Sequence, residues 1–267
     1  MISPLALVDP KAKIADNVTI EAFSVVYADV VIGEGTHVMP NVTIFNGSRI
    51  GRHCRIFPGA VIGAIPQDLK YGGELTTVEI GDHTTVRECV TVHLGTKDKW
   101  VTKVGSHCLL MAYVHVAHDC LIGNHVILAN AVQLAGHVVI DDYAIIGGLA
   151  GAQQFTHIGA HSYVAGHALI RKDVPPYLKA ARDPLTYAGV NKVGLLRRGF
   201  TREQIEEVAN IYHILFVQGN STSKSLELIE ATSPESPLRN EILKFVRSST
   251  LGIIRKAKEE IDENLAL

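Results

Sequence analysis

The sequence of 267 residues predicts an all-β domain, a parallel β-helix, followed by a small α-helical domain. Three observations lead to this fold class. Branched aliphatic residues recur every six positions, small residues occupy fixed places within each hexad, and a helical periodicity replaces the hexads near the C-terminus. A period of six fits neither an amphipathic helix, which repeats near 3.6 residues, nor a simple strand, which repeats near 2. It fits short strands joined by turns and wound into stacked coils.

The aliphatic phase extends over residues 8–170. Of its 28 positions, 24 hold Val, Ile or Leu, and the exceptions are Asp68, Glu74, Asp98 and Ala152. The residue two places before each aliphatic one is usually small. One branched and one small inward side chain per short strand can fill a narrow core.

Glycine often follows the aliphatic residue. It does so at Gly33, Gly51, Gly63, Gly81, Gly105, Gly123, Gly147 and Gly159. We expect positive φ at these positions, because glycine adopts that conformation at no steric cost.

Two segments interrupt the pattern and divide the expected wall. Residues 63–79 place Asp68 and Glu74 in the aliphatic phase, and residues 94–103 do the same with Asp98. We expect both segments to protrude as loops, which is where binding residues commonly lie on a rigid scaffold. The β-helix is therefore predicted to span residues 1–176, including these loops.

Residues 177–267 are predicted to form a linker and the α-helical domain. From Thr201 the apolar residues follow helical spacing, Thr201 and Gln204 match a capping box, and Gly219 is a plausible stop. Further helices are expected around residues 222–231, 237–248 and 250–263.

Composition excludes several classes of protein. The formal net charge of −2 argues against a nucleic-acid-binding protein, and no apolar run reaches the roughly 18 residues of a membrane span. The N-terminus lacks the basic start of a secretory signal, so we expect a cytoplasmic protein.

The four cysteines contain no CxxC pair, and three of them share one small-residue position. We interpret them as free thiols rather than disulfides or metal ligands.

The densest polar cluster lies in the segment HVAHDC, residues 115–120. If one coil holds three hexads, as the family resemblance given below implies, His118, Gly136 and Gln154 fall in one column on the outer wall, with neighbouring Cα atoms about 5 Å apart. Asp119 and His137 form the adjacent column. The His118 imidazole would lie beside the backbone N–H of Gly136, where no side chain blocks approach. This pair suits acyl transfer, which needs a general base and an oxyanion donor. Asp119 can orient His118 only if the chain turns there, because consecutive strand residues point to opposite sides.

Two other interpretations of this cluster remain open. The histidines could decorate a solvated face, or His115, His118 and His137 could bind zinc as three imidazole ligands, as in proteins resembling γ-class carbonic anhydrases.

Several segments closely resemble the UDP-N-acetylglucosamine O-acyltransferase family of hexapeptide-repeat enzymes. They are IPQDLKYGGE (65–74), ECVTVHLGT (88–96), VAHDCLIGN (116–124), LAGHVVIDDYAIIGG (134–148) and GVNKVGLLRRGF (189–200). The resemblance covers nearly the whole chain, including both loops and the helical tail. It implies a left-handed parallel β-helix with three hexads per coil.

The resemblance also implies an activity, which is transfer of an (R)-3-hydroxyacyl chain from acyl carrier protein to the 3-hydroxyl of UDP-N-acetylglucosamine, the first step of lipid A biosynthesis. The implied setting is the cytoplasm of a Gram-negative-type bacterium. The implied assembly is a homotrimer with sites between adjacent prisms, and neither a cofactor nor a metal is expected. Basic residues near the end of the prism would meet the acidic carrier protein; they are Arg171, Lys172, Lys179, Arg182, Arg197, Arg198 and Arg202.

Residue roles follow from the same resemblance. His118 is implied as general base, Asp119 as its supporting carboxylate and Gly136 as oxyanion donor. Positions matching substrate-contacting residues are Gln67, Asp68, Lys70, His93, His115, His137, Gln154, Asn191, Arg197 and Arg198. Gly166 matches the position that limits acyl length, and a glycine there implies chains of about 14 carbons or longer.

One departure from the family concerns Gln153, where many members have histidine. It leaves open the choice between UDP-N-acetylglucosamine and its 3-amino analogue. Rival functions are a coenzyme A-dependent acetyltransferase or a zinc hydratase of the same repeat class, and a purely structural β-helix.

Overall fold

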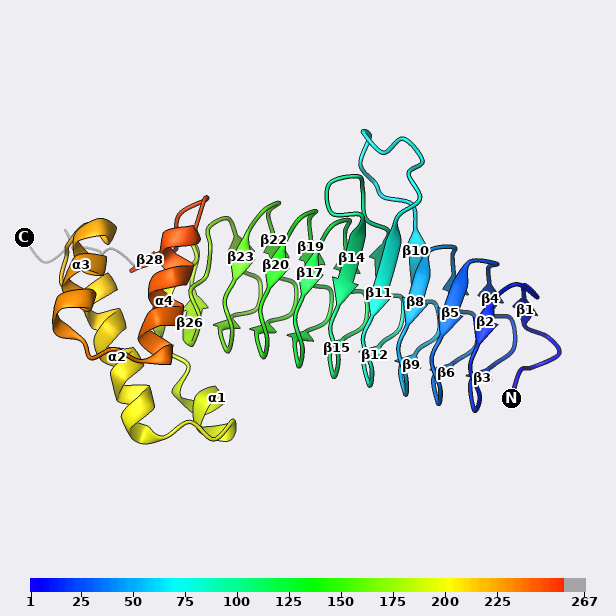
Figure 1. Ribbon diagram of the computed structural model, residues 1–267, viewed down its shortest axis with the longest axis horizontal. Coiled ribbons are helices and arrows are strands. Elements are labelled where there is room, and N and C mark those ends of the chain that lie inside the picture. Colours follow the sequence, from blue (N-terminus) through cyan, green and yellow to red (C-terminus); the bar gives the residue numbers. More distant parts are fainter. Residues whose placement is uncertain (257–267) are drawn as a thin grey trace, which may run out of the picture.

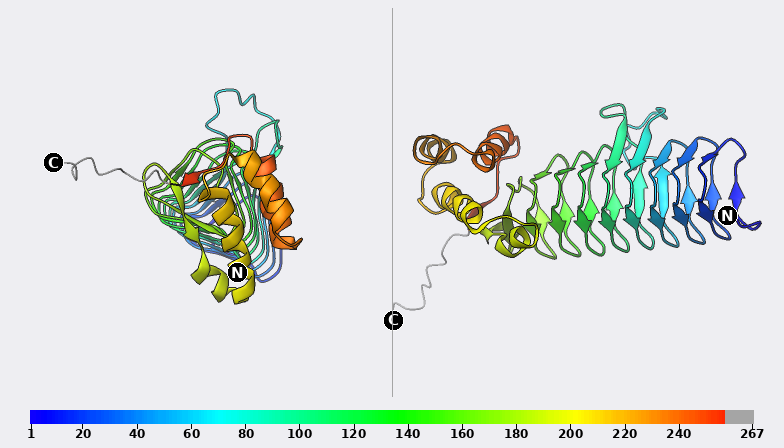
Figure 2. Two further views of the ribbon diagram at one scale, coloured as in Figure 1. Left: turned by 90° about the vertical axis from the view of Figure 1, so that its left-hand side faces the viewer. Right: turned by 60° about the horizontal axis from the view of Figure 1, so that its bottom comes forward.

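The computed structural model describes residues 1–256, and most of this length is a long prism walled by three parallel β-sheets (Figure 1). Each coil of the chain contributes one short strand to each sheet in turn, and the view along the prism shows the walls stacked coil on coil (Figure 2). The predicted parallel β-helix with a helical C-terminal region is confirmed.

The strands fall into three sheets, which we number I to III in the order in which the chain visits them. Sheet I contains β1 (Leu7–Val8), β4 (Val25–Val26), β7 (Thr43–Ile44), β10 (Val61–Ala64), β13 (Thr91–His93), β16 (His115–Val116), β19 (Gln133–Leu134), β22 (Gly151–Ala152) and β25 (Leu169–Ile170). Sheet II contains β2 (Lys13–Ile14), β5 (Val30–Ile32), β8 (Ser48–Ile50), β11 (Thr77–Ile80), β14 (Val101–Val104), β17 (Leu121–Ile122), β20 (Val139–Ile140) and β23 (His157–Ile158). Sheet III contains β3 (Thr19–Ile20), β6 (His37–Val38), β9 (Arg55–Ile56), β12 (Thr85–Val86), β15 (Leu109–Leu110), β18 (Ile127–Leu128), β21 (Ile145–Ile146), β24 (Tyr163–Val164), β26 (Leu178–Ala181), β27 (Thr186–Val190) and β28 (Arg255–Lys256).

The strand register explains why the six-residue phase survives its two interruptions. In an uninterrupted coil, a residue pairs with the one three hexads later, as Leu121 pairs with Val139. Val61 instead pairs with Thr91, five hexads later, and Thr91 pairs with His115, four hexads later. The first interruption therefore adds two hexads and the second adds one. Because both insertions are whole hexads, the inward phase is kept.

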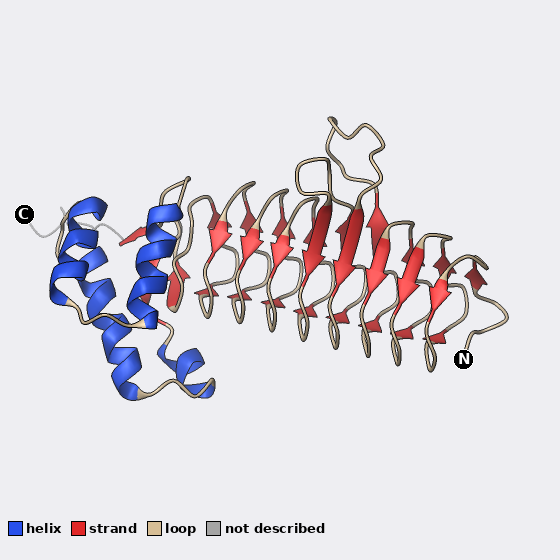
Figure 3. Ribbon diagram, viewed as in Figure 1, coloured by secondary structure: helices blue, strands red, loops and turns tan. Residues whose placement is uncertain are grey.

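The two added segments protrude from the same edge of the prism, where sheet I passes into sheet II (Figure 3). The first loop comprises residues 65–76 between β10 and β11, and the second comprises residues 94–100 between β13 and β14. We call this edge the I/II edge.

The core runs as a column inside the prism and continues into the helical cap. The aliphatic residue of nearly every hexad is buried, and so is the small residue two places before it, as at Cys54 and Ile56. Cys54, Cys108 and Cys120 are buried free thiols, whereas Cys89 is exposed and also free. The small inward residues let three sheets approach closely enough for the branched residues to fill the centre.

The expectation of positive φ at the glycine that follows the aliphatic residue was wrong, with Gly63 (φ 79°) the exception among the eight. The left-handed residue lies two places later and is usually not glycine, as at His125 (φ 56°) and His137 (φ 64°). The glycine is needed for space instead. A Cβ at Gly81 would lie 2.6 Å from the carbonyl carbon of Gly105 on the next coil.

Beyond Pro176 the chain continues as sheet before it becomes helical. Residues expected as a linker form β26, which pairs with β24, and β27, which pairs antiparallel with β26. The helices are α1 (Lys192–Arg197), α2 (Arg202–Phe216), α3 (Thr222–Thr232) and α4 (Pro237–Ser248). They cap one end of the prism, as the right-hand view of Figure 2 shows. The capping box that begins α2 is formed by Thr201 and Gln204 as predicted.

The helix expected around residues 250–263 was wrong over 250–256, and 257–263 lie outside the described residues. Ile253 bridges to Asp173 at the end of the prism, and β28 pairs with β27. Ile254 is buried there. Pairing with a distant sheet edge outweighs local helical preference in this segment. None of the helices described combines the length and apolar character of a membrane span.

Candidate active site

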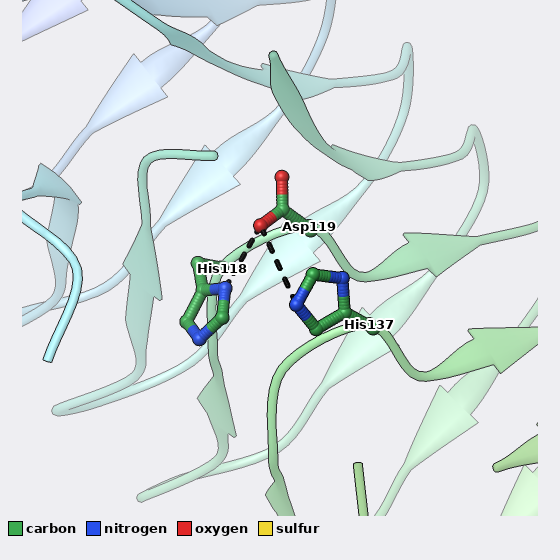
Figure 4. Close-up of side chains that lie close together, drawn as sticks. All are labelled: His118, Asp119 and His137. Carbon is green, nitrogen blue, oxygen red and sulfur yellow. Dashed lines mark hydrogen bonds and ion pairs between the residues drawn. The ribbon is translucent and has the colours of Figure 1, made fainter. Parts of the chain in front are cut away.

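A buried histidine–aspartate pair lies at the I/II edge, just after β16 (Figure 4). His118 Nδ1 lies 2.8 Å from Asp119 Oδ2, and the two side chains are 7% and 0% exposed. An ionised carboxylate can only accept a hydrogen bond, so Nδ1 of His118 carries the proton and donates a hydrogen bond to Asp119. Nε2 of His118 is thereby left with a free lone pair, which is the form a general base needs.

The pair exists because the chain turns at Asp119. Asp119 has φ 60°, a left-handed conformation that reverses the direction its side chain would take in an extended strand. The Asp119 N–H donates to Thr102 Oγ1 (2.8 Å), which holds the turn against sheet II. The condition on which the sequence argument depended, a turn at Asp119, is met.

The Asp119 carboxylate is held by the loop of residues 94–100. Oδ1 accepts from the N–H groups of Thr96 (2.9 Å) and Lys99 (3.2 Å), and Oδ2 accepts from Thr96 Oγ1 (2.7 Å). Burial raises the pKa of Asp119, but the hydrogen bonds from Thr96 and His118 outweigh burial, so its pKa is lowered overall. The carboxylate therefore stays ionised beneath His118.

The opposite face of the His118 ring lies against Gly136, one coil away. A Cβ at Gly136 would lie 2.4 Å from Cε1 and 2.5 Å from Nε2 of His118. Among residues 1–256, the Gly136 N–H makes no hydrogen bond, so it is free to donate to a ligand. The predicted column thus packs the His118 ring against Gly136, a residue whose backbone N–H is uncommitted.

A groove of about 510 Å³ opens beside this pair along sheet I. Five of the predicted site residues line it, namely Gln67, His115, His118, Gly136 and Gln154. Gln153 and Arg171 also line it, and Leu169 and Ile170 form part of its apolar wall. The groove has room for an elongated ligand whose reacting group lies at His118.

Two further histidines beside the groove are neutral near pH 7. Burial, with the neighbouring His115 and His118, lowers the pKa of His93 to about 4, and burial also lowers the pKa of His115. The two rings meet edge to face with centroids 4.8 Å apart. His115 Nδ1 lies 2.7 Å from Thr91 Oγ1, so its Nε2 remains available for a ligand. Because these two imidazoles are neutral, they can hydrogen-bond a ligand without placing a positive charge that would disfavour protonation of His118.

His137 occupies the column next to His118. Its Nε2 lies 3.9 Å from Asp119 Oδ2 and its Nδ1 lies 3.1 Å from Asp98 Oδ2, on the same loop as Thr96. The ring stacks on Phe155 with centroids 4.5 Å apart. His137 therefore lies near two carboxylates at the edge of the site, and its ring is supported by stacking on Phe155.

The zinc interpretation requires His115, His118 and His137 to converge. In the described part of the chain, the ligand atoms that lie within 4.8 Å of one another belong to His118, Asp119 and His137. His115 is outside this group. Both oxygens of Asp119 and the Nδ1 of His118 are already used in hydrogen bonds. The donors as placed do not form a three-histidine site.

The first loop carries Asp68 and Lys70 beside Gln67. Asp68 Oδ1 accepts from the N–H of Lys70 (3.0 Å), and the Lys70 side chain is exposed. Gly166 lies on another edge, between β24 and β25, where a Cβ would lie 3.1 Å from the Gly148 carbonyl oxygen. None of Asp68, Lys70 and Gly166 lines the groove.

Asn191, Arg197 and Arg198 lie on the edge between sheets II and III, away from His118. Asn191 Nδ2 donates to the His161 carbonyl (2.9 Å), and an Arg198 N–H group donates to the Tyr143 carbonyl (2.9 Å). Arg197 ends α1 and is exposed. One chain therefore does not bring these three residues to the groove.

Sequence reasoning missed the residues that hold the site together. Thr96 and Asp98 contact Asp119 and His137 from the second loop, and Phe155 supports the His137 ring. The available signal was the interruption at residues 94–103, which precedes the histidine cluster by one coil.

Comparisons with known proteins agree with this geometry. Residues 173–254 match the family model described as UDP-N-acetylglucosamine O-acyltransferase, domain 2, and residues 11–46 and 102–136 match the bacterial transferase hexapeptide model. The chain is similar to the crystal structure of LpxA, a UDP-N-acetylglucosamine acyltransferase from Bacteroides fragilis, with 49% identity, coverage of 96% of this chain and 100% of that one, and a TM-score of 0.94.

Two more solved structures extend this likeness. A Francisella novicida UDP-N-acetylglucosamine acyltransferase is 41% identical over 100% of this chain and 99% of that one, with a TM-score of 0.94. An Arabidopsis UDP-N-acetylglucosamine acyltransferase is 29% identical over 97% of this chain and 100% of that one, with a TM-score of 0.85. The prism described above is the left-handed parallel β-helix of hexapeptide repeats.

Proposed function

Because this chain belongs to the UDP-N-acetylglucosamine O-acyltransferase family, we propose that it acylates UDP-N-acetylglucosamine as the first step of lipid A biosynthesis. The donor we propose is an (R)-3-hydroxyacyl thioester of acyl carrier protein, and the acceptor is the 3-hydroxyl of the sugar. The single observation that carries the proposal is the His118 ring, which is bound by the Asp119 carboxylate on one side and packs against Gly136 on the other.

The reaction follows from the protonation of these groups. Nε2 of His118 takes the proton of the sugar 3-hydroxyl as its oxygen attacks the thioester carbonyl carbon. The negative charge that develops on the carbonyl oxygen is stabilised by the Gly136 N–H. The intermediate then collapses, the carbon–sulfur bond breaks, and the imidazolium returns the proton to the departing thiolate. Asp119 stabilises the imidazolium while it exists.

Binding roles are proposed for the residues around this centre. Gln67, His115 and Gln154 line the groove and offer hydrogen bonds to the sugar, the pantetheine arm or the acyl hydroxyl. Contacts with substrate are proposed also for His93, His137, Asp68 and Lys70, which lie outside the lining of the groove in one chain. Asn191, Arg197 and Arg198 are proposed for the uridine diphosphate, because a guanidinium can hold phosphate oxygens bidentately.

We propose a homotrimer, since the diphosphate residues and His118 lie on different edges of one chain. A second copy placed against sheet I would bring its own α1 region to the groove.

The basic residues proposed for the acidic carrier protein divide into two groups. Lys172 and Arg198 already donate to carbonyl groups within the chain, whereas Arg171, Lys179, Arg182, Arg197 and Arg202 are exposed. We place the exposed group at the docking surface, in a protein located in the cytoplasm.

The proposal is tested by incubating the purified protein with UDP-N-acetylglucosamine and a panel of 3-hydroxyacyl carrier proteins. We expect acylated sugar nucleotide and free carrier-protein thiol in equal amounts. Parallel reactions with acetyl coenzyme A and with bicarbonate distinguish the rival acetyltransferase and hydratase, and the 3-amino sugar nucleotide tests the consequence of Gln153. Absence of product from every 3-hydroxyacyl donor would overturn the assignment.

The acyl length is proposed to be limited at Gly166, with chains of about 14 carbons or longer accepted. Gly166→Met places a side chain at an exposed position where the Cβ would lie 3.1 Å from the Gly148 carbonyl oxygen. We expect the preference to shift to shorter donors in competition assays with mixed chain lengths. An unchanged preference would exclude Gly166 as the length-limiting position.

A further inference from the structure

The loop of residues 94–100 makes contacts that a bare coil would lack. It supplies three of the hydrogen bonds to the Asp119 carboxylate, two from Thr96 and one from Lys99. The fourth comes from His118 itself. Without the loop, a fully buried carboxylate would keep only its histidine partner, and an unsatisfied buried charge is costly.

Thr96 is the centre of this arrangement. It is buried, at 7% exposure, and it contacts both carboxylate oxygens of Asp119, through its N–H and its hydroxyl. The hydroxyl oxygen also accepts from the N–H of Asp98 (3.3 Å). Asp98 in turn lies 3.1 Å from Nδ1 of His137. The Thr96 hydroxyl therefore fixes the Asp119 carboxylate behind His118. It also holds the backbone of Asp98, whose carboxylate lies beside His137.

The orientation of Asp119 decides which nitrogen of His118 is free. Oδ2 receives both the Thr96 hydroxyl and the His118 Nδ1–H, so rotation of the carboxylate would break both bonds. A carboxylate that loses its anchor can turn away from Nδ1, and the His118 ring then loses both its tautomer and its position over Gly136.

We propose that Thr96 is a positioning residue for the proposed acyl transfer, acting on the His118 base through Asp119. It does not touch substrate in this role. Because the proposal rests on the proposed function, its test uses a substrate pair on which the wild-type protein has first been shown to turn over.

The test is a double-mutant cycle on Thr96 and Asp119. Thr96→Val removes the hydroxyl and keeps the shape, and we expect kcat to fall about 10–100-fold, the loss typical of removing a group that orients a reacting one, with KM changed less than about twofold. Thr96→Ser keeps the hydroxyl and should restore most of kcat. In an Asp119→Ala background, Thr96→Val should change kcat by less than about twofold, because the group through which it acts is absent.

Thr84→Val provides the matched control. Thr84 is a fully buried threonine at a different edge of the prism, and its hydroxyl donates to the Gly105 carbonyl and accepts from the N–H of Cys108. Its loss should lower the melting temperature without changing kcat. Thr96→Ala serves as a second variant with the same expected result if valine prevents folding.

The possible outcomes are distinct. A wild-type protein with no turnover contradicts the proposed function and leaves no rate to compare. An active wild type with normal kcat in Thr96→Val overturns the positioning role. The positioning role is also overturned if Thr96→Val lowers kcat by the same factor in the Asp119→Ala background as in the wild type. A purely structural effect does not depend on Asp119.

Discussion

At the scale of single residues, the site depends on a contact across one coil. His118 and Gly136 lie three hexads apart and share a hexad position, so the repeat stacks them without any specific long-range design. The contact is close enough that only glycine fits beneath the imidazole. The same stacking places His137 beside Asp119.

Gly136→Ala tests this contact. The added Cβ would lie 2.4 Å from the His118 ring, and the backbone at Gly136 does not have positive φ, so the clash with the ring is the main consequence. We expect kcat to fall about 100-fold, a loss comparable to that of an oxyanion donor. Steady-state kinetics and a melting curve check this, and a fully active Gly136→Ala protein would show that the ring does not work from this position.

Residue-level prediction succeeded where the repeat decides which residues stack, and it left open what depends on backbone conformation at the corners. The column of His118, Gly136 and Gln154 follows from the six-residue register together with the three hexads per coil that the family resemblance implied. The contact between His118 and Asp119 depends on φ 60° at Asp119, and no residue type marks that conformation in this chain. The anchoring by Thr96 depends on how a loop folds, which six-residue periodicity does not describe.

At the scale of the elements, each corner of the prism uses two positions with different demands. The residue after the aliphatic one is often glycine because the next coil lies against it, and the residue two places later adopts the left-handed turn. Sequence reasoning combined these two demands into one, because glycine satisfies both. Only the structure separates a steric need from a conformational one.

Gly81→Ala and Gly151→Ala form a matched pair for this distinction. A Cβ at Gly81 would lie 2.6 Å from backbone atoms of the next coil, whereas at Gly151 the nearest atoms are 4.0 Å away. We expect Gly81→Ala to lower the free energy of unfolding by about 1–3 kcal/mol, the usual cost of overpacking. Gly151→Ala should change it little. Denaturation at one protein concentration measures both, and equal effects would contradict the steric explanation.

The C-terminal elements show the limit of local signals. The capping box of α2 was predicted because Thr201 and Gln204 act within one helical turn. The segment around Ile253 and Ile254 has helical spacing but pairs with the end of the prism instead. Such pairing is decided by the position of a distant sheet edge, which the segment itself does not encode.

At the scale of the whole molecule, the prism distributes its candidate residues over different edges. His118, Asp119 and Gly136 lie at the I/II edge, and Arg197 lies beyond sheet II with α1. A site that uses both groups needs two copies. The family resemblance implied sites between adjacent prisms, but the sequence does not tell on which edge each residue lies, because the packing of the α1 region is decided by contacts such as that between Asn191 and the His161 carbonyl.

Mixed oligomers test the division. Oligomers of His118→Ala alone lack the base, and oligomers of Arg197→Glu alone should bind the sugar nucleotide weakly. If the two residues of one site come from different copies, co-expression should restore activity at up to about a quarter of wild type, the share of interfaces with both residues intact. No recovery, in mixtures shown by tagging to contain both variants, would place the whole site within one copy.

The central claim is that His118 acts as the general base of acyl transfer to UDP-N-acetylglucosamine. It is tested most directly by the initial rate of acylated product formation from a 3-hydroxyacyl carrier protein, with wild type and His118→Ala compared at equal concentration and equal folded fraction. We expect turnover by the wild type and a kcat about 10²–10⁴-fold lower in His118→Ala. A His118→Ala protein that acylates the sugar at the wild-type rate would contradict it.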